Sequence, residues 1–181
     1  AVRGDNGQGI WTYDLQAHYG IVFKMDHAPV LADFNNDGKL DVFIIGGFGE
    51  YPPNNNHGRA YALTAGDESG PGWPMFRHDG NHTGYSSSTA PNVNNTAWSY
   101  PTGGAVYSSP AVSGGRVFVG STNGTVYALS ATDNTVNVIW KRKLGPAAIN
   151  SSPTVSGGLV FVGSTDGCLY ALDASSGKEN W

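Results

Sequence analysis

The sequence has few cysteines, few charges and no long apolar run, and each scarcity narrows the class of protein. Cys168 is the one cysteine among 181 residues, so no internal disulfide framework can form. Charged residues make up 13% of the chain, about half of the roughly 25% found in soluble domains. No apolar segment approaches the ~20 residues that span a bilayer. With 10 Lys+Arg against 14 Asp+Glu and no basic patch, we expect no nucleic-acid binding and no membrane span.

Glycine and aromatic residues, by contrast, are abundant. The 26 glycines are about twice the usual share, and aromatic side chains make up 12% of the chain. Together with many Asn, Ser and Thr residues, this composition indicates short β-strands joined by tight turns. It also favours secretion to an extracellular, cell-surface or periplasmic location. Sequons of the form Asn-x-Ser/Thr would accept N-linked glycans in a secretory setting, although this composition also produces them by chance; they begin at Asn81, Asn94, Asn123 and Asn150.

The second half of the chain contains an internal repeat. Residues 106–131 and 149–174 align with an offset of 43 and are identical at 18 of 26 positions, so the segment is duplicated. Each copy predicts the same order of strands and turns, with a Ser-Gly-Gly turn, a Val-Phe-Val-Gly strand, a Thr-Asn/Asp-Gly hairpin turn and a Tyr-Ala-Leu strand. A further strand carries Trp140 in one copy and Trp181 in the other. Four antiparallel strands in about 42 residues match the period of a β-propeller blade.

The first half repeats this frame in diverged form. Residues 1–11 align without gaps on 171–181 and share the alanine, glycine and tryptophan of that segment. Residues 60–65 repeat the third-strand pattern and lead to Trp73. A polar, Pro-containing stretch then interrupts the period. The three strand sets are fewer than the roughly four to eight blades that close a propeller. We therefore expect a segment of a larger propeller, or a protomer that completes its ring by assembly, whose open blade edges bind a protein partner or another copy.

Two repeat families resemble these segments. Residues 98–181 resemble the pyrroloquinoline-quinone-like (PQQ-like) propeller repeats, because Ala171, Asp173, Ser176, Gly177 and Trp181 match their tryptophan-docking motif, with Ser where Thr is usual. Residues 28–47 resemble an FG-GAP repeat of the integrin α-subunit type. The resemblance implies an all-β propeller architecture, and the predicted parts are an FG-GAP-like blade at 1–72, a linker at 73–97 and two PQQ-like blades at 98–181. It implies no single activity, because the PQQ-like family includes quinoprotein dehydrogenases, assembly scaffolds and surface proteins.

An acidic loop in the first half has the spacing of a calcium site. Its pattern is D-x-N-x-D-G-x-x-D, and Ca²⁺ binds six to eight oxygens at about 2.3–2.6 Å. Three carboxylates within nine residues would repel one another in a metal-free Asx turn, so we expect a structural Ca²⁺ that rigidifies a long inter-strand turn. The expected ligands are four side chains and one backbone carbonyl, from Asp33, Asn35, Asp37 and Asp41 and from Lys39 respectively.

Other candidate sites have weaker patterns. A quinone-dependent dehydrogenase would need the central funnel of a complete propeller, and the tryptophans recur once per repeat, which is typical of packing between blades. Arg3-Gly4-Asp5 has the form of an integrin-binding tripeptide but aligns with a polar turn. His78 and His82 beside Asp79 have no strand or helix to fix their spacing, and a glycan-binding module would need exposed aromatics such as Tyr51, Tyr85 or Tyr107. We therefore predict a non-catalytic, calcium-binding extracellular scaffold or protein-interaction module, with a fragment of a quinone-dependent dehydrogenase or a glycan-binding module as the alternatives.

Overall fold

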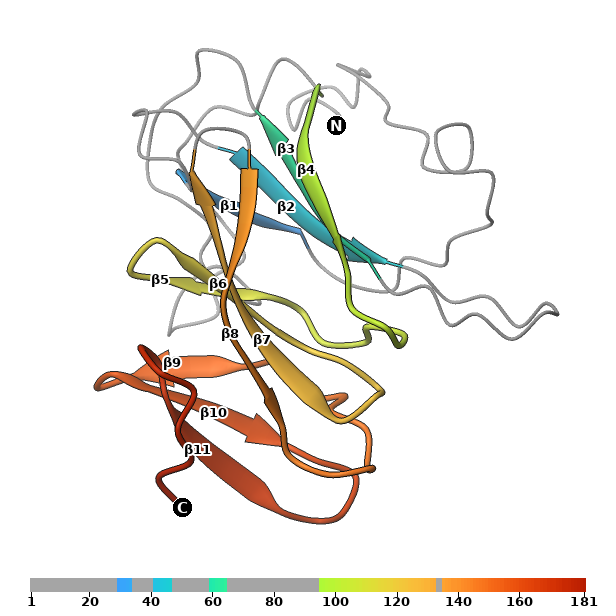
Figure 1. Cartoon of the computed structure of the whole chain (residues 1–181), viewed down its shortest axis with the longest axis vertical. Coiled ribbons are helices and arrows are strands. Elements are labelled where there is room, and N and C mark those ends of the chain that lie inside the picture. Colours follow the sequence, from blue (N-terminus) through green and yellow to red (C-terminus); the bar gives the residue numbers. More distant parts are fainter. Residues whose placement is uncertain (1–28, 34–40, 47–58, 65–94, 133–134) are drawn as a thin grey trace, which may run out of the picture.

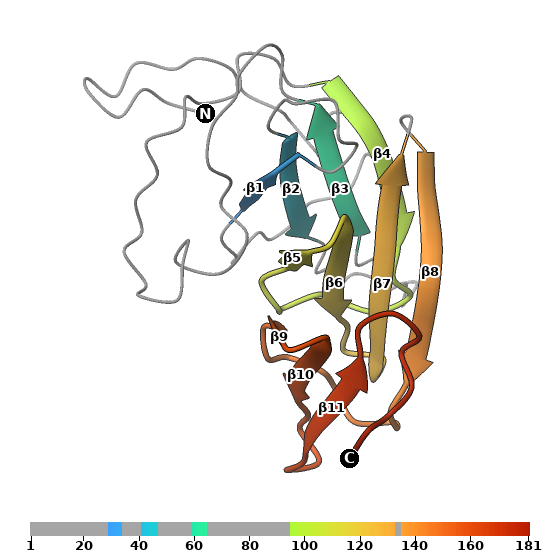
Figure 2. The same ribbon diagram turned by 90° about the vertical axis from the view of Figure 1, so that its left-hand side faces the viewer.

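The computed structural model describes residues 29–33, 41–46, 59–64, 95–132 and 135–181. All regular secondary structure in these ranges is β-strand, and the strands form three antiparallel sheets. Figure 1 shows the sheets following one another along the long axis of the molecule, in the order of the sequence. The turned view in Figure 2 shows the same succession, with the third sheet at one end of the stack.

The first sheet has the order β1-β2-β3-β4. Its strands are β1 (Val30–Ala32), β2 (Asp41–Gly46), β3 (Arg59–Thr64) and β4 (Asn95–Pro101). A register shift between Ala62 and Leu63 marks a bulge where β3 pairs with β4. The strand that pairs with β3 carries Trp98, whereas Trp73, to which residues 60–65 lead in the sequence, lies outside the described residues. Residues 65–94 separate β3 from β4, whereas only two residues separate the corresponding strands of the next sheet, β7 (Thr125–Thr132) and β8 (Thr135–Lys143), so the tryptophan period is interrupted here.

The second sheet repeats this arrangement, and the third repeats most of it. The second has the order β5-β6-β7-β8, and the third has the order β11-β10-β9. Beyond β11, Leu172 and Glu179 form an antiparallel bridge, and the backbone N–H of Ala171 donates to the carbonyl of Trp181 at 3.0 Å, so residues 179–181 occupy the place of a fourth strand. The strands are β5 (Ala111–Ser113), β6 (Arg116–Gly120), β7 (Thr125–Thr132), β8 (Thr135–Lys143), β9 (Thr154–Ser156), β10 (Leu159–Gly163) and β11 (Leu169–Asp173).

The predicted all-β fold with four-stranded antiparallel blades is confirmed. The first strands of successive sheets touch, with β1 against β5 and β5 against β9, as expected for blades that share an axis. The described sheets do not close into a ring. The predicted boundaries at residues 72–73 and 97–98 stay predictions, although the end of the predicted linker lies within β4.

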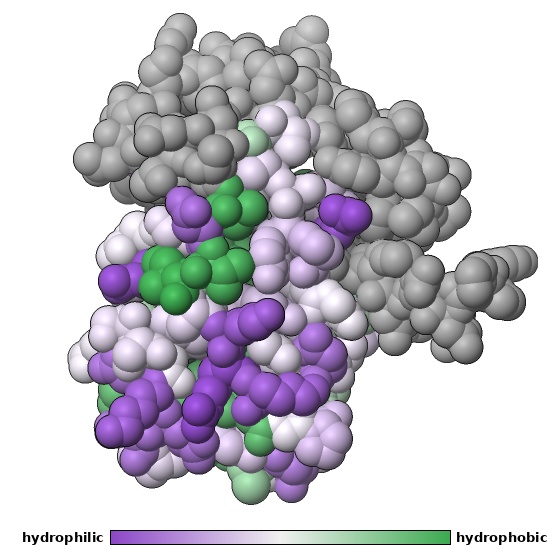
Figure 3. Space-filling view, in the orientation of Figure 1, coloured by the Kyte–Doolittle hydropathy of each residue, from purple (hydrophilic) through white to green (hydrophobic). Residues whose placement is uncertain are grey.

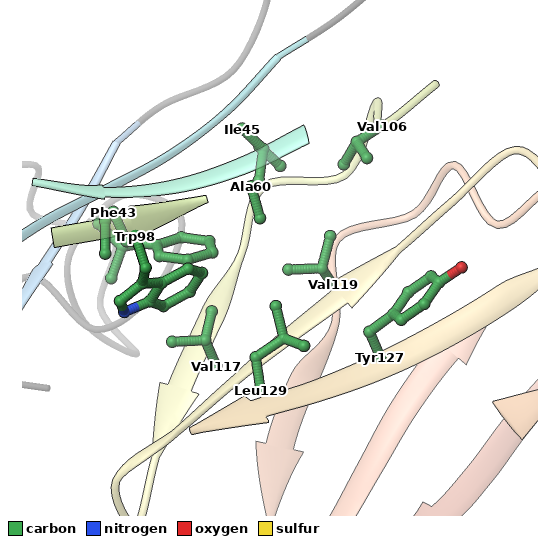
Figure 4. Close-up of a cluster of buried hydrophobic side chains, with 11 residues drawn as sticks. Phe43, Ile45, Ala60, Trp98, Val106, Val117, Val119, Tyr127 and Leu129 are labelled. Carbon is green, nitrogen blue, oxygen red and sulfur yellow. The ribbon is translucent and has the colours of Figure 1, made fainter. Parts of the chain in front are cut away.

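Two apolar cores lie between the sheets. The first joins the first and second sheets, and Figure 4 shows Phe43 and Trp98 packed in it, with ring centroids 5.5 Å apart, and Val117 and Leu129 nearby. The second joins the second and third sheets around Phe118, Val126 and Trp140 on one side and Ile149, Val160 and Leu172 on the other. Each fully buried aliphatic or aromatic side chain contributes about 1.5–3 kcal/mol to folding.

The middle sheet is buried on both faces because neighbouring residues of a strand point to opposite sides. In β6, Val117 and Val119 face the first sheet while Phe118 faces the third. In β10 the same alternation leaves Val160 and Val162 buried but Phe161 only half-buried. The third sheet is therefore covered on one face and open on the other.

The surface is mixed in character. Figure 3 shows a hydrophobic patch beside the middle sheet and mainly hydrophilic residues over the part of the molecule where the third sheet lies. The described part of the chain contains no helix with the length and apolar character needed to cross a membrane.

Candidate functional site

The acidic loop connects the first two strands of the first sheet. Ala32 of β1 pairs with Asp41 of β2, so Asp33 and Asp41 lie at the two ends of the loop, next to each other in space. In the second and third sheets, the equivalent pairs are Ser113 with Arg116 and Ser156 with Leu159, and only two glycines join the strands. The long loop is thus an insertion at a turn that the other blades close with two residues.

The two described carboxylates of this loop lie in a sheltered position. Asp41 is 4% exposed and Asp33 is half-buried. Asn35, Asp37 and Lys39 lie outside the described residues, so the complete predicted ligand set is not brought together here. Within the described ranges, no three His, Cys, Asp or Glu side chains gather at metal-binding distance. Pairing of the two strands therefore places two of the five predicted ligands at the same end of the sheet, and calcium binding stays a prediction.

Trp140 docks on the last turn of the third sheet. Its indole Nε1 donates a hydrogen bond to the backbone carbonyl of Ala174 at 3.1 Å, and its ring lies against Gly177. A Cβ at Gly177 would lie 2.6 Å from Cδ2 and Cε3 of the ring, and this residue has φ +68°. Only glycine combines that backbone conformation with so close an approach. The docking motif is thus a contact between consecutive blades, made by the tryptophan of one and the glycine turn of the next.

Asp173 holds that turn in place. One carboxylate oxygen accepts hydrogen bonds from the backbone N–H and the hydroxyl groups of Ser175 and Ser176, at 2.5–3.1 Å. The backbone N–H of Gly177 donates to the carbonyl of Asp173 at 2.8 Å. The side-chain hydrogen bonds from Ser175 and Ser176 lower the pKa of Asp173 to about 2. The ionised form of Asp173 is therefore the one that orders the docking turn.

The serines of the Ser-Ser-Pro motif fasten strands within and between blades, a role that the sequence analysis missed. Ser108 Oγ donates to the carbonyl of Gly120 and accepts from its N–H, and Ser151 Oγ does the same at Gly163. The second serine of the motif links the two blades. The backbone N–H of Ser109 in the second blade donates to Oγ of Ser152, its counterpart in the third blade, at 2.9 Å. The sequence signal for this role was the recurrence of a serine hydroxyl 43 residues apart, because such a hydroxyl can hydrogen-bond to nearby backbone groups.

The hairpin turns of the second and third blades carry equivalent polar pairs in different surroundings. In the second blade, Asn123 Nδ2 and Tyr127 Oη both donate to the carbonyl of Thr102, at 2.8 and 2.5 Å. In the third blade, Tyr170 Oη donates to Asp166 Oδ2 at 2.9 Å. This hydrogen bond raises the pKa of Tyr170 to about 12, while the backbone N–H of Cys168 and then Tyr170 lower the pKa of Asp166.

The trailing face of each blade, defined as the side that meets the next blade, is covered in the second blade and open in the third. Trp140 is 8% exposed, whereas its counterpart Trp181 is 58% exposed. Val126 is 0% exposed, whereas Leu169 at the same repeat position is 56% exposed. The Phe–Trp pair itself is retained, with ring centroids 5.9 Å apart for Phe118 and Trp140 and 6.1 Å apart for Phe161 and Trp181. The third blade thus presents an assembled apolar face that nothing in the described structure covers.

The remaining predicted positions are scattered. Asn123 is half-buried, and a glycan on its Nδ2 would replace one of the two hydrogens that this nitrogen donates to Thr102 and to Tyr127, whereas Asn150 is exposed. Tyr107 is half-buried. Cys168 is an exposed free cysteine. The other predicted positions lie outside the described residues, namely Asn81, Asn94, Arg3-Gly4-Asp5, His78, Asp79, His82, Tyr51 and Tyr85.

Comparison with known proteins gives one family. The sequence profile of the PQQ-like repeat family described as outer membrane protein assembly factor BamB matches residues 77–181, which is more than half of the chain. The matched stretch includes all of the second and third sheets and β4. No curated protein matches the chain.

Proposed function

Because the chain belongs to the PQQ-like repeat family described as outer membrane protein assembly factor BamB, we propose that it is a non-catalytic propeller module that binds another protein. The observation that carries this proposal is the open trailing face of the third blade, with Leu169 and Trp181 exposed. Exposed apolar surface of this kind is typical of protein interaction sites, in which tryptophan is a frequent anchor. The family description, which names a protein that acts in the assembly of other proteins, supports the same role.

Site-directed photo-crosslinking tests this proposal. A photo-reactive amino acid at position 169 should capture a partner protein when the chain is expressed in its own host. The same group at Ser113, the exposed last residue of β5 in the second blade, is the matched control and should capture little. A crosslinked product that depends on position 169 and is lost in Trp181→Ala supports the proposal. Equal products at both positions, or none at position 169, would contradict it.

We further propose that the Asp33–Asp41 loop binds a structural Ca²⁺ in an FG-GAP-like first blade of an extracellular or periplasmic protein. The support is the position of the loop, because strand pairing places Ala32, the residue before Asp33, opposite the buried Asp41 and so brings the two ends of the loop together. Oxygen donors alternating along a loop of this length suit a hard cation. The bound ion would tie β1 to β2, where the other blades use only a two-glycine turn.

Calcium titration tests the ion site. At a free Ca²⁺ concentration 100 times the dissociation constant, binding stabilises the folded chain by about 2.7 kcal/mol, so Ca²⁺ should raise the unfolding temperature and EGTA should reverse the rise. Asp37→Asn should abolish most of this shift. Asp166→Asn, which removes a turn carboxylate from the third blade, is the control and should leave the shift intact. Equal stabilisation of the wild type and Asp37→Asn would contradict the assignment.

The alternative activities have direct assays. With added quinone cofactor and Ca²⁺, the chain should show no dye-coupled alcohol oxidation, and measurable turnover would contradict the non-catalytic proposal. Retention on a glycan array that is lost in Tyr107→Ala would favour the glycan-binding alternative instead.

A further inference from the structure

We infer that the outer edge of β8 binds an acidic, extended segment of a partner protein, which joins the second sheet as a further strand. β8 is the last strand in the order β5-β6-β7-β8, so among the described strands β7 alone pairs with it. An edge strand presents unpaired backbone N–H and C=O groups, and an extended peptide can bind by pairing with them. This surface is separate from the trailing face of the third blade, so the inference goes beyond the proposed function.

The place of β8 in its blade keeps this edge accessible. The first strands of successive sheets touch, and β8 lies at the opposite side of its sheet, on the outer rim. Figure 2 shows β8 along one side of the molecule, while the first and third sheets lie above and below the second. A further blade would pack against the face of a blade and not against this rim. The exposure of β8 therefore does not depend on how many blades the ring has.

The backbone of β8 points two pairs of hydrogen-bonding groups outward. The N–H of Leu144, just beyond β8, donates to the carbonyl of Gly124 at 2.9 Å, so these two residues form a hydrogen-bonded pair at the end of the ladder between β7 and β8. In an antiparallel ladder, hydrogen-bonded and non-hydrogen-bonded pairs alternate. Lys141 and Lys143 consequently belong to non-hydrogen-bonded pairs, and their N–H and C=O groups are directed away from β7, toward the open edge.

The side chains of β8 give this edge an apolar half and a cationic half. Val138 and Ile139 are each 38% exposed, and Lys141, Arg142 and Lys143 follow them as exposed residues. Figure 3 shows a hydrophobic patch at the level of the middle sheet, with hydrophilic residues adjoining it. A strand with apolar residues at one end and carboxylates at the other would complement both halves.

The positive charge of this edge is only partly neutralised within the chain. Arg142 forms an ion pair with Glu179 of the third blade at 3.3 Å. Lys143 Nζ donates to the backbone carbonyl of Asn123, which carries no formal charge. In the part of the chain that the structure describes, neither lysine of β8 has an ion pair. Three consecutive cations are therefore matched by one carboxylate, and the excess favours an acidic ligand.

Comparison of the outer strands shows that the blade fold does not require these side chains. β4 and β8 both have a register shift just before their tryptophan, so their positions can be matched from that residue. The exposed apolar pair of β8 corresponds to Thr96 and Ala97 of β4, and the three cations correspond to residues 99–101, which carry no charge. A structural requirement of the blade would recur in both strands. The surface of β8 is thus specific to the second blade.

An acidic segment fits this edge better than a second copy of the chain does. Lysines on an edge strand oppose pairing with another such edge, because like charges then come together. The same lysines favour a strand with carboxylates opposite them, and complementary charge selects the partner. A nucleic acid or an anionic membrane would use the charge of the lysines but not their outward backbone groups. The experiment must therefore separate backbone pairing from attraction by charge alone.

A synthetic peptide with the sequence ETETVVT, capped at both ends and fluorescently labelled, is the probe. In antiparallel pairing its two glutamates lie opposite Lys143 and Lys141, and its valines lie near Ile139 and Val138. Fluorescence anisotropy with the full chain should show saturable binding. The charge-reversed peptide KTKTVVT should bind at least about tenfold more weakly. N-methylation of the two glutamates keeps their charges and removes the N–H groups that would face β8, and it should also abolish most of the binding. Absence of binding by ETETVVT, or equal binding of its N-methylated form, would overturn the inference.

Amide hydrogen exchange identifies the binding mode. The backbone N–H groups of Lys141 and Lys143 should exchange more slowly when the peptide is bound, whereas that of Arg142, which is directed toward β7, should change little. Binding that leaves both lysine amides unprotected would mean attraction by charge alone and would overturn the inference.

Two charge reversals test the surface in the chain itself. Lys141→Glu should weaken binding of ETETVVT at least about tenfold. Lys178→Glu makes the same change at an exposed residue outside β8 and should leave the affinity nearly unchanged. Both side chains are exposed, so both variants should keep the wild-type unfolding temperature. Equal losses of affinity would contradict a site on β8.

Self-association is the remaining outcome. Lys141→Pro removes an outward N–H and is tolerated at an edge of this kind. Dimers of the free chain that disappear in Lys141→Pro, measured by sedimentation velocity, would assign the edge to a second copy and overturn the inference. Crosslinking from position 169 does not involve β8, so the proposed function and this inference can fail separately.

Discussion

The second and third blades are nearly the same in sequence and differ in what covers them. Their repeats are identical at 18 of 26 positions, and both place a phenylalanine of the second strand against the tryptophan at the outer edge of the blade. The tryptophan of the second blade is buried and hydrogen-bonded, whereas that of the third is largely exposed. Burial of this face is therefore decided by the neighbouring blade rather than by the sequence of the blade itself.

This difference shows how a repeat architecture distributes its stability. Each blade carries the residues of an internal blade, so stability is the sum of the blade's own packing and of its contacts with neighbours. Within the described residues, the second blade has two such contacts and the third has one. Substitutions at equivalent positions of the two blades should consequently lower the free energy of unfolding by different amounts. The difference measures how much the contact with the next blade contributes to stability.

The largest expected difference in lost stability is between Trp140→Ala and Trp181→Ala. Loss of the buried indole should destabilise the chain by about 3–5 kcal/mol, because a cavity opens between the second and third blades. Loss of the exposed indole removes one ring contact with Phe161 and should cost about 1 kcal/mol or less. Urea unfolding of the two variants and of the wild type measures both values. Equal destabilisation would show that Trp181 is already covered in solution.

A smaller difference in lost stability is expected between Gly124→Ala and Gly167→Ala. Both substitutions place a side chain on a backbone with positive φ, which costs about 1–2 kcal/mol. At Gly124 the new methyl group also overlaps the carbonyl oxygens of Gly145 and Ala147, which should add about 1–3 kcal/mol. The difference between the two unfolding free energies isolates the contact with the next blade. If the two variants lose the same stability, the segment after β8 does not pack on this turn as described.

Much of this arrangement was predictable from the sequence because the repeat itself fixes it. The 43-residue offset, the glycine turns and the Val-Phe-Val-Gly strands predicted the second and third sheets, and the structure has strands at those places. The sequence did not show which strand follows the third-strand pattern of the first blade, because residues 65–94 interrupt the period, and only strand pairing shows that Trp98 lies on β4, beside β3. A period can be extended along a chain only where no insertion intervenes.

Two features of the site could not be predicted because they depend on contacts between blades. The sequence shows that Ser109 and Ser152 are equivalent, but not that one donates to the other. It likewise presents Trp140 and Trp181 as equals, since their difference lies in the presence of a neighbour. The loop at Asp33–Asp41 is the opposite case. Its ligand pattern is local and can be read from sequence, and the structure adds that β1 and β2 bring its two ends together.

The smallest expected effect concerns the acid stability of the turn under Trp140. The pKa of Asp173 is lowered from 3.8 to about 2 in the folded chain, so its contribution to stability is present above pH 4 and is lost as the pH falls through 2. Asp173→Asn keeps an oxygen acceptor for Ser175 and Ser176 but does not titrate, so its unfolding temperature should fall less steeply than that of the wild type between pH 4 and pH 2. All other carboxylates are common to both proteins, and the difference between the two pH profiles therefore belongs to Asp173. Because Asp173 is at the surface, the effect should be small. Parallel profiles would mean that the docking turn is held by its backbone hydrogen bonds and by Trp140, without help from the charge.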